Sequence, residues 1–367
     1  MPHPLIPEHV HIGPGCLQRL GGLARRVGMS RVLIVSDGGI VAAGYVDLAR
    51  RPLEAAGVEV HTFHDFSENP DSNMVEAGRR AAAALRVDGL IGLGGGSSMD
   101  CAKGINFVLT NGGVMSEYRG YGKASQPMLP MIGVPTTAGT GSEAQSYALI
   151  SDPATHVKMA CGDPKAAFAA VILDPELTIS QPAGVAAAAG YDAISHAVET
   201  WVTTKRSDGS EACSKEAWRL LSTSFERVLA ARHDVDAGEA MLVGAYLAGA
   251  AIEQSMLGAA HACANPLTAH YGTTHGVAIG ILLRRVVRWN AADSAVAARY
   301  ARLAPDLGGC LEALASAGQF PAGLAAVGVP KDDLETLARD AAAQWTGAFN
   351  PRPFDASGAR EIYEMTW

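Results

Sequence analysis

Short apolar runs alternate with longer amphipathic segments over the first half of the chain. The apolar runs are rich in Val, Ile and Leu, and their lengths are typical of strands: residues 31–37, 58–63, 89–93 and 128–134. The segments between them have the spacing of helices, clearest at residues 46–56 and 73–86. Alternation of strands and helices predicts a parallel sheet covered by helices on both faces.

The character of the chain changes after Thr178. Beyond residues 180–184, which suit a linker or a helix start, alanine-rich helical patterns dominate to the C-terminus. We therefore expect an α/β domain over residues 1–178 and an all-helical domain over 179–367. The longest apolar stretch, residues 240–260, contains Glu253, Gln254 and several glycines, so it is better interpreted as a buried helix than as a membrane span.

The composition is that of a globular protein, and the net charge excludes some classes of binding partner. Its 367 residues suffice for two domains, with 48% hydrophobic and 18% charged residues. The net charge of −8 argues against nucleic acid or an anionic membrane as partner, because both attract basic surfaces.

The cysteines and the N-terminus indicate a cytoplasmic protein. The cysteines are scattered and form no CxxC pair: Cys16, Cys101, Cys161, Cys213, Cys263 and Cys310. In a chain of this length such spacing is typical of reduced thiols rather than of disulfides. The first residues show no basic region followed by an apolar one, so no signal peptide is expected.

A glycine-rich turn follows the predicted strand at 89–93 and opens a predicted helix. Its residues Gly94, Gly95, Gly96 and Ser97 let the backbone turn tightly and approach a ligand closely. Backbone amides at a helix start favour a phosphate. The spacing is not GxGxxG, and the alternative is a strand-to-helix turn without a ligand.

A second polar segment, residues 135–143, follows the next predicted strand. It is dense in hydroxyls and small residues, and alone it could be a flexible surface loop. Because ligands of open α/β sheets bind at the carboxyl ends of the strands, two such loops in one sheet favour a nucleotide site. Asp37 ends the first strand, where a carboxylate accepts hydrogen bonds from an adenosine ribose and repels a 2′-phosphate. The alternative is a helix N-cap or turn residue beside Gly38 and Gly39.

Histidines and one aspartate in the second half suggest a metal site. Asp192 and His196 lie four residues apart in a helical segment and share one face, although a surface pair would look the same. His261 ends the long apolar stretch, where an unpaired polar group is costly. His270 and His275 follow, and the spacing leaves open which of them is the third histidine ligand. Asp plus three His suits Fe²⁺, Zn²⁺, Ni²⁺ or Mn²⁺.

With these residues in view, the chain resembles the iron-containing (group III) alcohol dehydrogenases over nearly its full length. Seven stretches match in the family's order: residues 9–15, 94–97, 135–143, 174–178, 190–199, 258–276 and 350–353. The resemblance implies a Rossmann-like, parallel-sheet dinucleotide domain followed by a helical metal-binding domain, a dehydroquinate synthase-like fold.

The resemblance also assigns roles to residues. The family's metal ligands fall on Asp192, His196, His261 and His275, which selects His275 over His270. Its cofactor contacts fall on Asp37, Gly94, Gly95, Gly96, Ser97, Asp100, Thr136, Thr137, Thr140 and Lys158. Lys158 would lie near the nicotinamide ribose and Tyr147 in the substrate pocket, against the alternatives of a surface lysine and a core aromatic.

Two positions depart from the family pattern. Asn265 stands where many members have a histidine that is thought to relay the proton and line the substrate site, and Thr274 replaces the usual proline before the last ligand. These departures weaken the expectation of the family's proton relay, and His270 is an alternative residue for proton transfer. They also suggest that the chain belongs to a less familiar subgroup.

The expected function is a metal-dependent, NAD(P)-linked interconversion of a small alcohol and its aldehyde or ketone. The metal, Fe²⁺ or alternatively Zn²⁺ or another divalent ion, would act as a Lewis acid, and NAD(H), favoured over NADP(H) by Asp37, would carry the hydride. Look-alike proteins suggest a homodimer or larger homo-oligomer. The alternatives are a maleylacetate reductase-like or other superfamily enzyme, or a non-catalytic nucleotide- or metal-binding relative.

Overall fold

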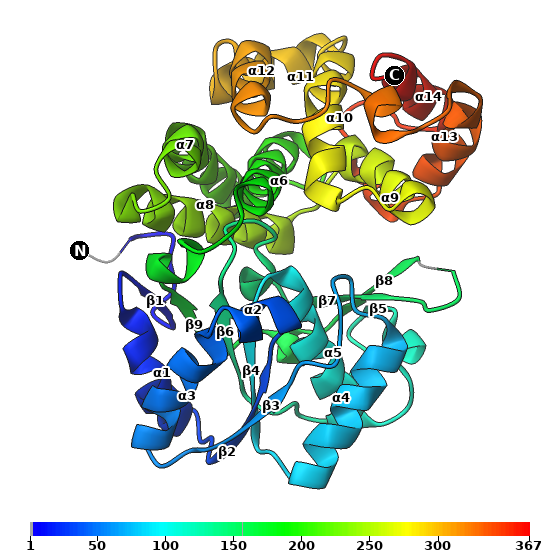
Figure 1. The fold of residues 1–367 in the computed structure, drawn as a ribbon. Coiled ribbons are helices and arrows are strands. Elements are labelled where there is room, and N and C mark those ends of the chain that lie inside the picture. The colour runs from blue at the N-terminus through cyan, green and yellow to red at the C-terminus, as the bar shows by residue number, and fades with distance from the viewer. Residues whose placement is uncertain (1–2, 156) are drawn as a thin grey trace. The chain divides into compact units, whose positions relative to one another are not determined.

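The computed structural model describes residues 3–155 and 157–367, and the chain divides into two compact units (Figure 1). The α/β unit comprises the chain up to Ser180 without residues 138–140, and the helical unit comprises Gln181–Trp367 together with Ala138–Thr140. The sequence placed the boundary between residues 178 and 179 and did not anticipate the transfer of the short segment 138–140.

A parallel six-stranded sheet forms the centre of the α/β unit, as predicted. Its order is β1-β9-β6-β4-β2-β3, and every neighbouring pair is parallel. Its strands are β1 (Val10–Ile12), β2 (Arg31–Val35), β3 (Glu59–Phe63), β4 (Gly89–Gly94), β6 (Met131–Pro135) and β9 (Ala170–Leu173). Strands β4 and β6 are buried throughout, and β2 is buried except at Arg31, because helices cover both faces of the sheet.

Helices pack on the two faces of this sheet (Figure 1). On one face α1 (Leu20–Arg26) and α3 (Tyr45–Ala55) share a core with alternate strand residues such as Ile34, Ile91 and Ile172. The remaining helices of this unit are α2 (Gly38–Ala42), α4 (Ser72–Leu85) and α5 (Gly96–Asn111). The two-residue period of a strand sends successive side chains to opposite faces, so both faces need apolar residues.

A second, three-stranded sheet was not predicted. It has the order β5-β8-β7, formed by β5 (Gly120–Tyr121), β7 (Tyr147–Ser151) and β8 (Lys158–Gly162). The pair β7 and β8 is antiparallel. Its strands are short and partly exposed, so they lack the continuous apolar runs that mark the central sheet.

The helical unit is built from helices joined by loops and short 3-10 turns, and no strand forms within residues 181–367. Its helices are α6 (Ala183–Val202), α7 (Asp208–Ala230), α8 (Val235–Gln254), α9 (Ala259–Tyr271), α10 (His275–Asn290), α11 (Ser294–Leu303), α12 (Leu307–Ala317), α13 (Leu334–Ala342) and α14 (Ala356–Glu364). The predicted fold class, a parallel-sheet domain followed by a helical one, is confirmed.

The apolar stretch at residues 240–260 is not one helix. One helix of the described residues, α8, is long and apolar enough to cross a membrane, with a mean hydropathy of 1.3, but 72% of that window is buried inside the protein. The helix ends at Gln254, and α9 begins after Gly258, whose φ of −140° and ψ of −142° are not helical. The stretch therefore supplies the end of one core helix and the start of the next.

Candidate metal centre and nucleotide-binding loops

Helix α6 carries Asp192 and His196 one turn apart on one buried face. Only 7% of the Asp192 side chain and 5% of the His196 side chain are exposed. A carboxylate and an imidazole at this depth are costly unless each finds a partner. The predicted i, i+4 pairing is therefore a buried pair rather than a surface one.

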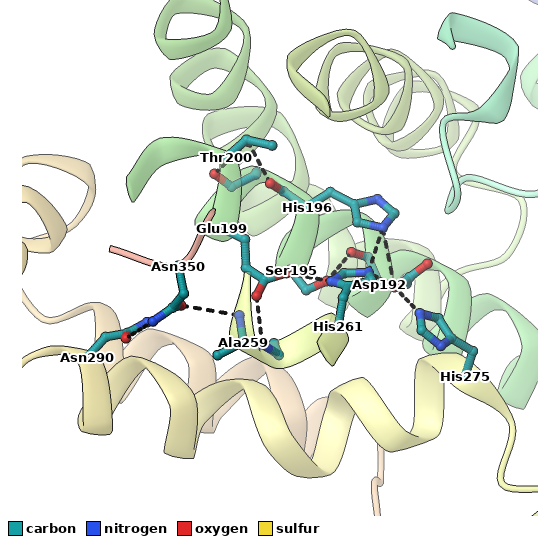
Figure 2. A network of polar contacts seen from close by, with 12 residues as sticks. Asp192, Ser195, His196, Glu199, Thr200, Ala259, His261, His275, Asn290 and Asn350 are labelled. Atoms are coloured by element: carbon teal, nitrogen blue, oxygen red, sulfur yellow. Dashed lines mark hydrogen bonds and ion pairs between the residues drawn. The ribbon is translucent and has the colours of Figure 1, made fainter. Parts of the chain in front are cut away.

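Helices α9 and α10 bring two further histidines to this pair (Figure 2). His261 lies in the first turn of α9, and His275 is the first residue of α10. Gly276 allows α10 to start here, since a Cβ at this position would lie 2.3 Å from the Ala188 carbonyl oxygen of α6. Thr274, in place of the family's proline, has φ of −52°, the backbone angle that a proline ring would impose.

Three imidazole nitrogens surround one carboxylate oxygen. The distances to Asp192 Oδ1 are 3.5 Å from His196 Nε2, 3.5 Å from His261 Nε2 and 3.6 Å from His275 Nε2. His196 Nε2 and His261 Nε2 are 3.1 Å apart. Within the described residues, Asp192 Oδ1 makes no hydrogen bond of normal length.

This arrangement fits a divalent cation. Bonds of about 2.1 Å from one tetrahedral cation would separate its ligand atoms by about 3.4 Å, close to the four distances given above. Asp192, His261 and His275 offer ligand atoms that all lie within 4.8 Å of one another. Two Nε2 atoms that face each other cannot both present a lone pair without repulsion unless a cation or proton lies between them. His275 is the most exposed of the three histidines, at 23% of its side chain.

Electrostatics within the cluster favour a negative carboxylate among nitrogens. Burial alone would raise the pKa of Asp192, but the surrounding imidazoles outweigh burial and hold that pKa well below its usual range. Burial lowers the pKa of His196. Burial would also lower the pKa of His261, but the Glu199 and Asp192 carboxylates reverse the direction and raise it.

Glu199 is a functional candidate that our sequence reasoning missed. Its Oε2 lies 2.5 Å from His261 Nδ1, and its Oε1 accepts a hydrogen bond of 2.7 Å from the Ala260 amide. The signal was available, because Glu199 follows Asp192 by seven residues, two helical turns, and so lies on the same stripe of α6. Only the pair formed by Asp192 and His196 was predicted from the sequence.

Two other predicted residues of α9 have partners outside the cluster. His270 is exposed, and its Nε2 lies 2.7 Å from Asp340 Oδ2. Asn265 is partly buried one turn after His261, and its Nδ2 donates to Gln344 Oε1 at 3.1 Å. The structure thus places His196, His261 and His275 around Asp192, whereas His270 contacts the exposed Asp340.

In the α/β unit, the glycine-rich turn joins β4 to α5 as predicted. Gly94 has φ of 143°, and a Cβ there would lie 2.4 Å from Ser98 Oγ, so only glycine fits. Gly95 caps α5, and Ser97 Oγ accepts a hydrogen bond from the Asn69 amide. The first amides of a helix have no acceptor within it, so this turn offers donors to an anion.

The hydroxyl-rich loop lies beside this turn because β4 and β6 are neighbours. The Thr136 amide donates to the Gly94 carbonyl at 2.9 Å, and a Cβ on Gly95 would be 3.4 Å from Thr137 Oγ1. Both loops follow strands of one sheet, as expected, and the structure shows in addition that these strands are neighbours. Thr140 belongs to the segment assigned to the helical unit.

Asp37 uses its two carboxylate oxygens differently. Oδ1 accepts hydrogen bonds from the Gly39 and Ile40 amides and so caps α2. Ser98 Oγ donates to Oδ2 at 3.4 Å, which places that oxygen beside the glycine-rich turn. The N-cap interpretation is confirmed, and the cofactor role stays a prediction.

Asp100 is part of a buried cluster on the α5 side of the same unit. It accepts a hydrogen bond of 2.7 Å from Ser142 Oγ, and burial raises its pKa. Lys103, fully buried, donates to Ser142 Oγ and to the carbonyls of Ser142, Gln145 and Tyr147. These bonds tie the helix that follows the glycine-rich turn to the end of the hydroxyl-rich segment.

The last two predicted residues belong to the small sheet. Tyr147 begins β7, and its ring covers Gly162 of β8, where a Cβ would approach the ring to 2.4 Å. Its ring centroid is 5.6 Å from that of Tyr121, which is exposed. Lys158 begins β8 and is partly buried, at a position where its charge lowers the pKa of Asp100 against the effect of burial.

Comparisons with known proteins match both units. Residues 7–175 match the family described as "Iron-containing alcohol dehydrogenase", and residues 186–367 match "Fe-containing alcohol dehydrogenase family, C-terminal". The chain is 34% identical to alcohol dehydrogenase 4 of Schizosaccharomyces pombe, over 94% of this chain and 84% of that protein. It is 32% identical to the NAD-dependent methanol dehydrogenase of Bacillus methanolicus, over 95% of both. A solved 1,3-propanediol oxidoreductase superposes with a TM-score of 0.95 at 29% identity, covering 100% of each chain.

Proposed function

This chain belongs to the iron-containing alcohol dehydrogenase family, and we propose that Asp192, His196, His261 and His275 hold its metal. The observation that carries the proposal is the buried Asp192 Oδ1, which has three imidazole nitrogens within 3.6 Å and no hydrogen bond of normal length among the described residues. Fe²⁺ is the first candidate, with Zn²⁺ or another divalent ion as the alternative for this N/O set. A cation bound there supplies a Lewis acid to the alcohol or carbonyl oxygen.

The reaction is the interconversion of a small alcohol and its aldehyde or ketone, with a nicotinamide dinucleotide as hydride carrier. We propose that the pyrophosphate binds at the turn formed by Gly94, Gly95, Gly96 and Ser97. The supporting geometry is the N-terminus of α5, where glycines keep side chains away from the backbone amides that a phosphate would approach. The other proposed cofactor residues are Asp100, Thr136, Thr137, Thr140 and Lys158.

Asp37 supports NAD(H) over NADP(H). Its Oδ2 lies beside the glycine-rich turn, where a carboxylate suits ribose hydroxyls and repels a 2′-phosphate. The methanol dehydrogenase relative is itself named NAD-dependent.

Two residues are proposed to contact the substrate, Tyr147 of the α/β unit and Asn265 of the helical unit. Tyr147 would offer an aromatic ring, and Asn265, whose amide donates to Gln344, would offer a polar group. Asn265 cannot exchange a proton as a histidine would, so His270 is the proposed proton-transfer helper. The Nε2 atom of His270 lies 2.7 Å from Asp340 Oδ2.

We also propose a cytoplasmic homodimer or larger homo-oligomer. The location is supported by the six cysteines, which form no disulfide among the described residues and five of which are buried. Size-exclusion chromatography with light scattering would measure the assembly.

Metal removal tests the proposed function. Protein stripped with a chelator, verified by metal analysis, should lose turnover of propanol or lactaldehyde with NAD(H), and adding Fe²⁺ or Zn²⁺ should restore it. His261→Ala should lower kcat/KM by about 10²-fold or more. His64→Ala removes an exposed histidine of the α/β unit and should leave kcat/KM unchanged. Full activity in verified metal-free protein would contradict the proposal and favour a metal-free relative.

A further inference from the structure

The start of helix α9 is capped by side chains from elsewhere in the helical unit. Its own N-cap residue is Gly258, which has no side chain to offer. The Ala260 amide donates to Glu199 Oε1 of α6 at 2.7 Å, and the Ala259 amide donates to Asn350 Oδ1 at 3.2 Å (Figure 2). Helix starts need acceptors for their first amides, and a carboxylate there also suits the helix dipole.

The second oxygen of Glu199 orients a metal ligand. Glu199 Oε2 lies 2.5 Å from His261 Nδ1, and the carboxylate accepts the proton of that nitrogen. A proton on Nδ1 leaves the lone pair on Nε2, the atom that faces Asp192 and His196. The carboxylate therefore fixes both the backbone and the tautomer of the same residue.

Gly258 makes room for this double contact. A Cβ at position 258 would lie 3.1 Å from Glu199 Oε1 and 3.0 Å from Asn350 Oδ1. Any other residue would press on both acceptors at once. The absence of a side chain at Gly258 thus lets the Glu199 and Asn350 side chains reach the first amides of α9.

Asn350, from the Asn-Pro-Arg-Pro segment near the C-terminus, has a structural role that differs from that of Glu199. Its Nδ2 donates to Asn290 Oδ1 at 2.8 Å, and Asn290 Nδ2 donates back to Asn350 Oδ1 at 3.2 Å. This amide pair orients Asn350 toward the Ala259 amide. Asn350 thus caps the same helix as Glu199, while the contact with the His261 ring comes from Glu199.

We propose that Glu199 is the positioning residue of the metal centre, acting through His261, and that Asn350 is a helix cap without this role. The inference rests on the proposed metal function. It predicts that Glu199 and Asn350, which both accept a hydrogen bond from an amide in the first turn of α9, differ in their effect on metal affinity.

Glu199→Gln separates the two roles of the carboxylate. A glutamine amide has one acceptor oxygen, so it cannot serve the Ala260 amide and His261 Nδ1–H together. If the oxygen stays at the helix, the NH₂ group faces Nδ1 and favours the tautomer with its proton on Nε2, which blocks the metal position. Asn350→Ala removes a cap and leaves the carboxylate in place.

The readouts are the dissociation constants of Zn²⁺ and Co²⁺, measured on chelator-stripped protein by competition with a chromophoric chelator. Glu199→Gln should weaken both by about 10- to 100-fold and alter the d–d absorption of bound Co²⁺. Asn350→Ala should lower the melting temperature of the stripped protein while both dissociation constants stay within about threefold of wild type. In kinetics, Glu199→Gln should lower kcat at saturating NAD, and Asn350→Ala should not.

Each outcome decides the proposal. Unchanged metal affinity in Glu199→Gln overturns it, and so does an equal loss in Asn350→Ala, because both results would make Glu199 an ordinary cap. If Glu199→Gln does not fold, Glu199→Asp replaces it. That variant retracts the carboxylate by one methylene and should weaken binding at least threefold, and unchanged binding overturns the proposal. Wild-type protein that binds neither cation would instead overturn the proposed metal function, and the inference with it.

Discussion

Asp37 illustrates how one side chain serves two purposes. Its Oδ1 caps α2, while its Oδ2 lies beside the glycine-rich turn. A substitution that removes the whole side chain would therefore mix a loss of helix stability with a change in cofactor choice. An asparagine keeps the capping oxygen and removes the charge.

Asp37→Asn should relax the choice between cofactors. Without the negative charge, the 2′-phosphate of NADP(H) is no longer repelled, and kcat/KM with NADP(H) relative to NAD(H) should rise about tenfold or more. Asp37→Gly should relax it as well, with a lower melting temperature from the lost cap. Asp293→Asn changes an N-cap with the same two contacts in the helical unit and should leave the ratio unchanged. A clear NADP preference in wild type would contradict the prediction.

Glu143 is a buried carboxyl whose titration should affect stability. Burial raises its pKa to about 7, so the folded state holds its proton more tightly than the unfolded chain, whose pKa is near 4.5. The stabilising contribution is present below about pH 4.5 and is lost as pH rises through 7, by at most on the order of 3 kcal/mol.

Glu143→Gln should remove this pH dependence. The amide is neutral at every pH, so the melting temperature of the variant relative to wild type should rise between pH 5 and pH 8. Differential scanning fluorimetry over that range measures it, with Glu226→Gln on the exposed face of α7 as the control. A constant difference between the two proteins would show that Glu143 is ionised throughout.

At the scale of elements, the proposed metal centre depends on how closely three helices approach. Helix α6 supplies a stripe of Asp192, His196 and Glu199, α9 supplies His261, and α10 begins with His275. The α10 start lies against the α6 backbone at Ala188, and the absence of a side chain on Gly276 permits this contact. The position of His275 therefore depends on a glycine that binds nothing.

Gly276→Ala should displace His275 and weaken metal binding. The new Cβ would meet the Ala188 carbonyl oxygen, which is backbone and cannot swing away, so α10 must shift. We expect at least a tenfold higher dissociation constant for Zn²⁺ and a lower melting temperature, since overpacking costs about 1–3 kcal/mol. Gly184→Ala in α6, where a Cβ meets nothing within 4 Å, should keep metal affinity and if anything raise stability. Equal metal affinity in the two variants would contradict this account.

At the scale of the whole molecule, the two compact units divide the chemistry. All four proposed metal ligands lie in the helical unit, and the glycine-rich turn, Asp37 and Thr136 lie in the α/β unit. Apart from Thr140, the residues proposed to bind the dinucleotide therefore lie in a different unit from those proposed to bind the metal.

Metal removal should abolish turnover without abolishing dinucleotide binding. We expect the dissociation constant of NADH, measured by its fluorescence, to stay within about threefold in metal-free protein. The melting temperature should fall, because a ligand that binds only the folded state stabilises it. His275→Ala should behave like stripped protein in both measurements, and loss of NADH binding in either would contradict the division.

The local patterns of the chain were enough to predict the central sheet, the helical second half and the two polar loops. Strand runs and helical spacing depend on neighbours within a few residues, and the structure retains them in β2, β4, α3 and α4 with small shifts of their ends. The small sheet escaped prediction because β5 has two residues and β7 and β8 are partly exposed. The prediction of one helix over 240–260 was wrong because hydropathy does not register the break at residues 255–258.

The sequence by itself determined which side chains were available for the site and, through one helical turn, that Asp192 and His196 share a face. It left His270 and His275 equivalent by spacing, and only the family resemblance chose between them. The arrangement of α6, α9 and α10 supports the same choice, because His275 Nε2 lies 3.6 Å from Asp192 Oδ1 and His270 lies beside Asp340. The contact of Glu199 with His261 likewise joins residues 62 positions apart. Such contacts depend on how helices pack, and local sequence patterns carry no distance between segments that are far apart in the chain.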